Sequence, residues 1–367
     1  MESLERIRRK ALDAGAAGVG VCDAEPFVAT AAAIEARVAA GMNAGMRFTF
    51  ADPARATDIR ASLPWAQRLV VVAWGYLPDA GSPGPAEPGT ARIARFATEN
   101  HYDGLRRVLA GIATALRADG HQAEPISDDN RLVDRAAAVR AGVGWWGKNT
   151  MVLAPGAGPW LLLGSVVTDA ELPVSEPMGR DCGTCDACLP ACPTGALVTP
   201  GLLDARRCLA YWLQAPGVIP YELRRAIDDR IYGCDDCLEA CPPGGRLLAG
   251  STAARGRTDL LELLGADDAT LLDRYGHWYI PRRQPRYLRR NALIALGNTG
   301  GPRAAAVAAG FLSNPDWLLR AHAAWAVGEV GDELAAVVLD AAAAGENHRE
   351  VQTEIVLARE VATAGLR

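Results

Sequence analysis

The sequence has no apolar stretch long enough to cross a bilayer, and we expect no secretion leader. A transmembrane helix needs about 20 consecutive apolar residues, and the longest apolar runs here are well short of that length. The charged start from Met1 to Lys10 is not followed by the apolar core of a signal peptide. We therefore expect no membrane association and a reducing, cytoplasmic location.

Positive charge is not in excess either. The formal net charge is -5 at pH 7, so an anionic partner such as a nucleic acid would have to bind a local basic patch. Hydrophobic residues make up 50% of the 367 residues, which is typical of a globular protein. The length suggests two or three domains.

Cysteine is nearly absent outside one segment. Of the nine cysteines, only Cys22 lies outside residues 182–241. The first run in this segment reads C-x2-C-x2-C-x3-C-P from Cys182 to Pro193, which is the ferredoxin pattern for 4Fe-4S ligands. We expect Cys22 to be a buried structural thiol.

The second cysteine run lacks the first cysteine of that pattern, and Cys208 is placed to supply it. In the ferredoxin pattern three close cysteines bind one cluster and the fourth binds the other. We therefore predict two 4Fe-4S clusters. The predicted ligands are Cys182, Cys185, Cys188 and Cys241 for one cluster, and Cys192, Cys208, Cys234 and Cys237 for the other. Zinc and disulfides remain as weaker alternatives, because zinc prefers paired C-x2-C units and disulfides need an oxidising compartment.

The first 175 residues alternate between strand and helix patterns, and we predict an exposed loop over 78–89. We predict an α+β fold with domains at 1–175, 176–248 (the clusters) and 249–367. The predicted helices span 2–14, 27–40, 105–118, 204–214 and 222–230, and the predicted strands span 18–22, 69–74, 151–153 and 161–167.

The last third contains an internal repeat. Residues 288–300 align with 319–331 at an offset of 31 residues, with matching Arg, Ala and Gly positions. This pattern resembles HEAT-like helical repeats, which bury a shared core by stacking. An ordinary helical bundle is the alternative.

One further stretch, 132–150, combines a carboxylate with a Gly/Trp turn. Asp134 precedes a helix of small residues, and the turn carries Lys148 and Asn149. By spacing alone, Asp134 is typical of a helix-start residue and Lys148 of a solvated lysine. A catalytic role for Asp134 is the alternative.

Several segments together resemble the epoxyqueuosine reductases, which make queuosine in tRNA by removing an epoxide oxygen. These segments are VDRAAAVRAGVGWWGKNT, CGTCDACLPACPTGAL, LDARRCLAYW, RIYGCDDCLEACP and LRRNALIALGN. The resemblance implies a base-off cobalamin held between the N-terminal and cluster domains and reduced through the clusters. It also implies a low-potential electron donor and a HEAT-like module that helps hold tRNA; we expect a monomer.

The resemblance also assigns roles to residues. It makes Asp134 the proton donor to the opening epoxide, which is sensible because charge builds on the oxygen. Burial should then raise the pKa of Asp134. The residues that it suggests for contact with cobalamin are Asp134, Cys234 and Asp235, with Arg60, Tyr102, Gly164 and Ala210 as weaker candidates.

This chain departs from the family pattern at three places near the substrate side. They are Glu99–Asp103, Cys208–Ala215 and Cys241–Gly244, where the family often shows GRDYH, CISYLTIE and CPWN. A diverged reductase acting on a small molecule therefore stays open. So does a non-catalytic two-cluster electron carrier.

Arginines with interleaved aromatics follow the cysteine segment. Such groups suit phosphate contacts and base stacking, although arginines in helical repeats also bind neighbouring carboxylates and carbonyls. The predicted tRNA-binding residues are Arg282, Arg283, Arg286, Arg289 and Arg290, beside Tyr275, Trp278, Tyr279 and Tyr287, with Arg224, Arg225 and Arg230 as an extension.

Overall fold

The computed structural model describes residues 2–77, 84–248, 256–301, 303–331 and 334–365. The chain divides into two compact units, each assembled from separate stretches of sequence. The first unit contains Met1–Ala80, Glu99–Arg207 and Asp235–Ser251; the second contains Gly81–Thr98, Cys208–Cys234 and Thr252–Arg367.

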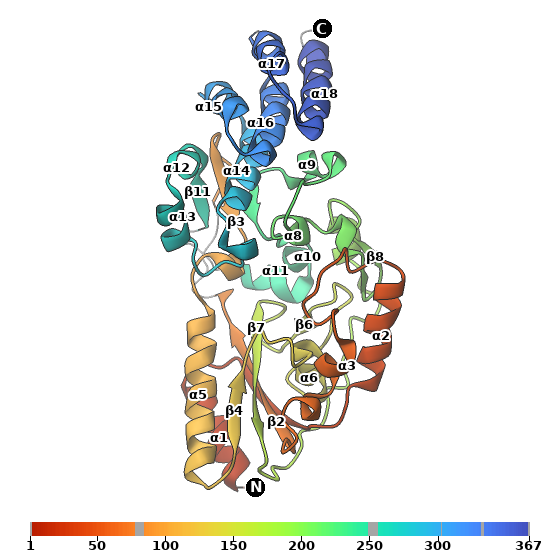
Figure 1. Ribbon diagram of the computed structural model, residues 1–367. Helices are drawn as coiled ribbons and strands as arrows, with labels where there is room; N and C mark the ends of the chain where they lie inside the picture. Colours follow the sequence, from red (N-terminus) through yellow and green to blue (C-terminus); the bar gives the residue numbers. More distant parts are fainter. Residues whose placement is uncertain (1, 78–83, 249–255, 302, 332–333, 366–367) are drawn as a thin grey trace. The chain divides into compact units, whose positions relative to one another are not determined.

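A four-stranded antiparallel sheet forms the centre of the first unit (Figure 1). Its strands, in sheet order, are β1 (Gly18–Asp23), β2 (Arg68–Gly75), β7 (Leu161–Thr168) and β4 (Ala123–Ile126). The two central strands pair along their whole length, from Arg68 opposite Thr168 to Gly75 opposite Leu161. The predicted strands over 18–22, 69–74 and 161–167 are therefore confirmed.

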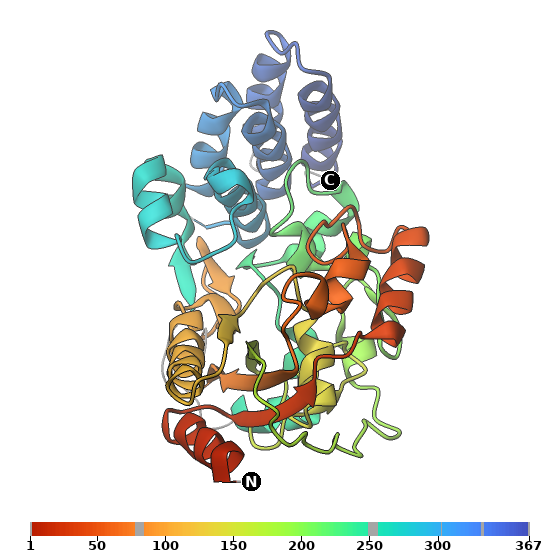
Figure 2. The ribbon, with the colours of Figure 1, turned by 60° about the horizontal axis from the view of Figure 1, so that its bottom comes forward.

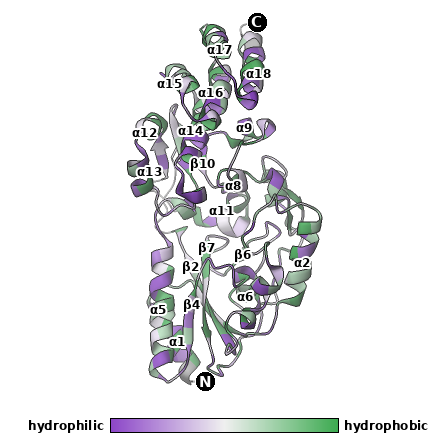
Figure 3. Cartoon of the chain, in the orientation of Figure 1, coloured by the Kyte–Doolittle hydropathy of each residue, from purple (hydrophilic) through white to green (hydrophobic). Residues whose placement is uncertain are grey.

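Helices cover both faces of this sheet. α1 (Glu2–Asp13) and α5 (Tyr102–Ala118) lie on one face (Figures 1 and 2). α5 is amphipathic, with alternating hydrophilic and hydrophobic residues (Figure 3). α6 (Asp134–Arg140) packs on the other face, where its alanines meet Val71 and Val167. Two further helices of this unit are α2 (Val28–Ala39) and α3 (Pro53–Thr57).

The cysteine runs of the first unit lie on loops and short elements. Cys188 lies in α7 (Cys188–Ala191) and Cys237 in α10 (Asp236–Glu239). The other short elements of this unit are β5 (Trp145–Trp146), β6 (Val152–Leu153), β8 (Leu197–Thr199), β9 (Leu202–Leu203) and α11 (Pro242–Leu248). The predicted single helix over 204–214 is wrong. Extended backbone at Cys208 separates a 3-10 turn, Ala205–Arg207, from α8 (Leu209–Trp212).

The second unit joins a small sheet to a stack of helices. The sheet contains β10 (Arg230–Tyr232), β3 (Thr90–Ile93) and β11 (Arg257–Asp259), in that order. The helices are α9 (Tyr221–Ile227), α12 (Leu260–Gly265), α13 (Asp268–Arg274), α14 (Arg286–Thr299), α15 (Ala304–Gly310), α16 (Trp317–Val330), α17 (Ala335–Ala343) and α18 (Arg349–Gly365).

The two aligned segments of the repeat are α14 and α16, which pack against each other. Asp316 begins α16 as its N-cap, and its carboxylate accepts a hydrogen bond of 2.9 Å from the Leu318 N–H. Leu209, Leu213 and Ile219 share a core with Ile294 and Trp325. The repeats therefore pack on the segment that contains Cys208.

One expectation falls partly on residues that the structure does not describe, and two strands were not predicted. Residues 78–83 of the predicted loop lie outside the described part, while 84–88 are exposed. The short strands β3 and β4 were not predicted, because four-residue segments such as AEPI carry little periodic signal. Within the described residues, no helix combines the length and the apolar character that crossing a membrane requires.

Candidate functional site

Six of the eight predicted cluster ligands lie in the first unit. The exceptions are Cys208 and Cys234, which belong to the second. All nine cysteines are free thiols, which contradicts a disulfide framework. Among the described residues, no group of three or more His, Cys, Asp or Glu side chains is arranged to hold a single metal ion.

The four cysteines predicted for the first cluster come together. The pKa of Cys188 is raised to about 11, mainly by burial, and the charges of Cys241, Cys182 and Cys185 contribute to the rise. Burial likewise raises the pKa of Cys241, with Cys182 and Cys185 adding to the effect. If these cysteines lost their protons, the negative charges of the resulting thiolates would repel one another. Iron ions would relieve that repulsion, so this donor set fits a thiolate-bound cluster.

The second set is divided between the two units. In the first unit, the Cys192 Sγ accepts a hydrogen bond of 3.2 Å from the Ala196 N–H, and the Cys237 carbonyl accepts one of 3.3 Å from Asn149 Nδ2. Cys208 and Cys234 belong to the second unit. The shared ligation of these four residues therefore stays a prediction.

Asp134 lies at the first turn of α6 and is half-buried. Desolvation raises the pKa of its carboxyl well above the usual value, and the negative charges of Asp128 and Asp129 add to this while Arg135 opposes it. The expected rise in the pKa of Asp134 is confirmed. Asp134 is not the N-cap of this helix, because Val133 occupies that position.

Two other residues stand beside this acid. Burial raises the pKa of the Tyr102 phenol, and the charges of Asp128 and Asp134 contribute to the rise. Desolvation also raises the pKa of Asp128, whose backbone has a φ of 52°. Tyr102, Asp128 and Asp134 therefore form a group of interacting acids whose pKa values are all raised. We call these three residues the acid cluster.

Sequence reasoning missed Asp128. The loop that carries it is held by Arg131, which forms ion pairs of 2.7 Å with both Asp129 and Glu124. A consecutive pair of aspartates after a short strand was the available signal. It was indistinguishable from an ordinary polar loop, because the position of α6 decides where the loop points.

The other proposed cobalamin contacts have local roles in the structure. Arg60 pairs with Glu25 at 2.8 Å and donates to the Ala66 carbonyl. A side chain at Gly164 would place its Cβ 2.7 Å from Leu109 Cδ1, so the glycine lets α5 pack on the sheet. Asp235 is buried, and its backbone carbonyl accepts hydrogen bonds from the Leu238 and Glu239 N–H groups of α10. Ala210, in α8, and Cys234 lie in the second unit.

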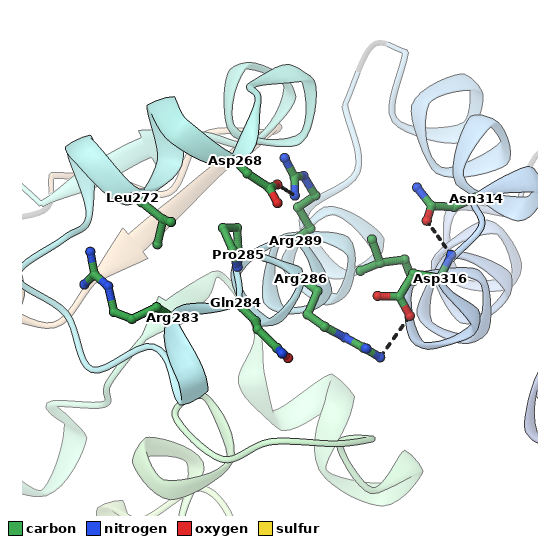
Figure 4. Close-up of a pocket in the computed structure, with 10 residues that line it drawn as sticks. Asp268, Leu272, Arg283, Gln284, Pro285, Arg286, Arg289, Asn314 and Asp316 are labelled. Carbon is green, nitrogen blue, oxygen red and sulfur yellow. Dashed lines mark hydrogen bonds and ion pairs between the residues drawn. The ribbon is translucent and has the colours of Figure 1, made fainter.

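Three of the predicted tRNA-binding arginines line one recess of about 400 Å³ in the second unit (Figure 4). They are Arg283, Arg286 and Arg289. Arg286 pairs with Asp316 at 2.9 Å, and Arg289 pairs with Asp268. The recess is therefore only partly basic, and Arg283 contributes its most exposed positive charge.

The prediction that Arg290 binds tRNA is wrong, because its side chain is buried. Its exposed fraction is 0%, and its guanidinium donates to the carbonyls of Trp212, Ala215 and Gly217. Burial lowers its pKa to about 9. Of the extension, Arg224 and Arg230 are buried, and the exposed Arg225 pairs with Glu329 at 2.9 Å.

Most of the accompanying aromatics are buried as well. Tyr275, Trp278 and Tyr287 belong to the core, whereas Tyr279 is 65% exposed. The surface available to a partner therefore reduces to Arg282, Arg283, Arg286, Arg289 and Tyr279. We call this set the basic rim.

Two family descriptions match the chain. Residues 181–244 match the 4Fe-4S double cluster binding domain, which spans both cysteine runs and Cys208. Residues 280–358 match HEAT repeats, which confirms that prediction for the last third. Together with the mixed first unit, these matches confirm the α+β class with a double-cluster segment and C-terminal repeats.

Similar proteins extend over nearly the whole chain. The epoxyqueuosine reductase of Vibrio cholerae is 33% identical over 343 residues, covering 88% of this chain and 91% of that relative. A crystal structure of an epoxyqueuosine reductase with an epoxyqueuosine-modified tRNA-Tyr stem loop has a TM-score of 0.88 at 28% identity, covering 98% of both chains.

A further solved structure is similar over the same length. The epoxyqueuosine reductase of Bacillus subtilis has been solved with an aspartate-bearing catalytic loop swung out of the active site, and it has a TM-score of 0.87 at 28% identity, covering 98% of both chains. These proteins match the chain over nearly its whole length, as the sequence motifs predicted. The chain belongs to the epoxyqueuosine reductase family.

Proposed function

We propose that this chain reduces epoxyqueuosine to queuosine in tRNA, with electrons passing through two 4Fe-4S clusters to a cobalamin and with Asp134 as the proton donor. Family membership supports the reaction, and the double-cluster match supports the electron path. Loss of the epoxide oxygen as water consumes two electrons and two protons. The chain must therefore supply protons as well as hold reducing centres.

The observation that carries the proposal is the raised pKa of Asp134. A carboxylic acid with a raised pKa holds its proton to higher pH, and it can give that proton to an oxygen on which negative charge develops. Asp128 helps to keep that proton in place through its negative charge. Tyr102, whose pKa is also raised, retains its phenolic proton beside the acid. The acid cluster thus has the chemistry of a proton source.

The cysteines at 182, 185, 188 and 241 would hold one cluster, and those at 192, 208, 234 and 237 would hold the other. A bound cobalamin supplies a strongly reducing metal centre. Tyr102 and Asp134 would contact it according to the family pattern, and both side chains are partly exposed. Arg60, Gly164, Ala210, Cys234 and Asp235 stay predicted contacts on the strength of the family pattern.

The basic rim is the proposed tRNA contact. Arg282 and Arg283 are exposed, and Arg286 and Arg289 are partly exposed beside their carboxylate partners. Phosphate contacts of this kind position a nucleic acid without reading its sequence. A low-potential reductant, a monomeric state and a cytoplasmic setting complete the proposal.

The test is incubation of the anaerobically reconstituted protein with epoxyqueuosine-containing tRNA and a low-potential reductant, followed by nucleoside analysis. Queuosine should appear. Asp134→Asn should retain iron and corrin absorbance while slowing turnover by about 10²–10⁴-fold. Full turnover by Asp134→Asn would remove the residue from the mechanism.

The same preparation separates the alternatives. Corrin bands without queuosine formation would indicate a diverged substrate. Iron–sulfur absorbance without any corrin uptake would indicate an electron carrier.

A further inference from the structure

The turn between β5 and β6 contains an unusual cation. Of the 38 lysines and arginines in the chain, only Lys10 and Lys148 are lysines. Lys10 is exposed on α1, whereas Lys148 is partly buried in the turn formed by residues 147–150. The sequence pattern alone favoured a solvated lysine at this position.

Lys148 instead contacts the first cysteine run. Its Nζ donates a hydrogen bond of 2.8 Å to the carbonyl of Gly183, which stands between Cys182 and Cys185. The N–H of the same glycine donates to Asp181 Oδ1 at 2.7 Å. Both backbone polar groups of Gly183 are therefore bound, and the ammonium group closes the loop that presents the first two cysteines.

The next residue of the turn contacts the second cysteine run. Asn149 is only 2% exposed, and its Nδ2 donates to the Cys237 carbonyl at 3.3 Å. Its Oδ1 accepts a hydrogen bond of 3.1 Å from the Met151 N–H, which fixes the orientation of the amide. Buried amides with both ends bonded have one orientation rather than several.

Further hydrogen bonds and close packing fix the conformation of the turn. The Lys148 carbonyl accepts a hydrogen bond of 2.8 Å from the Gly201 N–H, and the Gly147 N–H donates to the Met151 carbonyl at 2.8 Å. A Cβ at Gly147 would lie 2.4 Å from Asn149 Oδ1, so only glycine leaves room for this amide. All of these residues belong to the first unit.

We propose that the turn 147–150 is a positioning element for both iron–sulfur centres, with Lys148 holding and charging the loop of one cluster and Asn149 holding the loop of the other. Groups just outside the ligands orient them, and charge and hydrogen bonding set a cluster's reduction potential. A nearby ammonium stabilises the more negative, reduced state, so it raises the potential.

The experiment measures the clusters directly. Lys148→Gln, Lys148→Arg and Asn149→Ala are reconstituted anaerobically, iron and sulfide are counted, and both midpoint potentials are determined by redox titration followed by electron paramagnetic resonance. Lys10→Gln removes the only other lysine and serves as the matched control. The inference rests on the clusters of the proposed function, but the titration uses neither tRNA nor cobalamin, so it succeeds or fails independently of the substrate.

Lys148→Gln should lower one midpoint potential, so that the ratio of reduced to oxidised cluster falls about threefold or more at a fixed poise. Lys148→Arg should stay near the wild-type value, and Asn149→Ala should disturb the other cluster. Wild-type potentials in both Lys148→Gln and Asn149→Ala would overturn the proposal.

A variant that loses iron is informative as well. If Lys148→Gln loses iron while Lys148→Arg keeps it, the charged contact is supported. If both lose iron alike, or if Lys10→Gln shifts the potentials as much, the electrostatic role of Lys148 is refuted.

Discussion

The buried ion pair between Arg224 and Glu354 should contribute strongly to the thermal stability of the second unit. Glu354, on α18, receives two hydrogen bonds of 2.6 Å from the guanidinium of Arg224, on α9. The exposed fractions of the two side chains are 1% for Arg224 and 10% for Glu354. Arg224 also donates to the Ile219 carbonyl at 3.0 Å. Replacing Glu354 by Gln therefore leaves a buried guanidinium charge without its counterion.

The expected effect is large. Breaking a buried pair by removing one partner costs about 3–5 kcal/mol in unfolding free energy. For a unit of roughly 150–250 residues, about 1 kcal/mol shifts the melting temperature by about 2–4 °C. Glu354→Gln should therefore lower the melting temperature of the second unit by roughly 6–20 °C, measured by thermal unfolding followed by circular dichroism. The double variant Arg224→Met, Glu354→Leu should recover much of this loss, because no charge stays buried.

The matched control lies on the same helix. Arg359, on α18, pairs with Asp340, and their side chains are 46% and 55% exposed. Such exposed pairs contribute about 0–1 kcal/mol, so Asp340→Asn should change the melting temperature little. Equal melting temperatures for Glu354→Gln and Asp340→Asn would refute the reasoning.

Three further measurements test the acid, the buried histidine and the basic rim. Asp128→Asn should lower the pKa of Asp134, so the loss of kcat on raising the pH should begin at lower pH; an unshifted profile contradicts this. The pKa of His322 is lowered well below 6.5, mainly by desolvation, so the unfolded state binds the proton first. Unfolding free energy should fall below pH 6.5 by at most about 1.4 kcal/mol per pH unit, and His322→Gln should flatten that slope in urea titrations. Arg283→Gln should weaken tRNA binding and reduce its salt slope by about one, whereas Arg359→Gln should leave both unchanged.

The sequence predicted best where one physical signal dominates. The continuous apolar run at Leu69–Trp74 has to be a central strand, because both of its faces are buried. The repeat was visible because α14 and α16 must present the same faces to similar neighbours. Cysteine spacing carried the cluster prediction, because the ligands of one cluster must converge on one centre.

The acid cluster and the basic rim could be predicted only in part, because tertiary placement decides them. Asp134 was found through the family pattern, whereas Asp128 reaches the acid from a loop whose direction depends on α6. Arg289 and Arg290 are neighbours in sequence, but Arg289 is partly exposed and Arg290 is fully buried. α14 is buried around most of its circumference, so hydrophobic periodicity could not say which arginine faces inward. Arg290 faces the segment at 212–217, where three backbone carbonyls accept hydrogen bonds from its guanidinium.

The segment from Asp134 to Thr150 contains both the proposed proton donor and the turn that contacts the proposed cluster ligands. Its start carries the proposed proton donor, and its end contacts both cysteine runs. Arg135 links these ends, because it donates to the Thr150 carbonyl at 3.4 Å while its pKa responds to the charges of both Asp134 and Cys237. Desolvation is the largest influence on that pKa and lowers it. A negative charge at either end therefore interacts with the same guanidinium. A displacement of Thr150 would therefore alter a contact of Arg135, the residue next to Asp134. Variants in the turn should for that reason be judged by cluster potentials first and by turnover second.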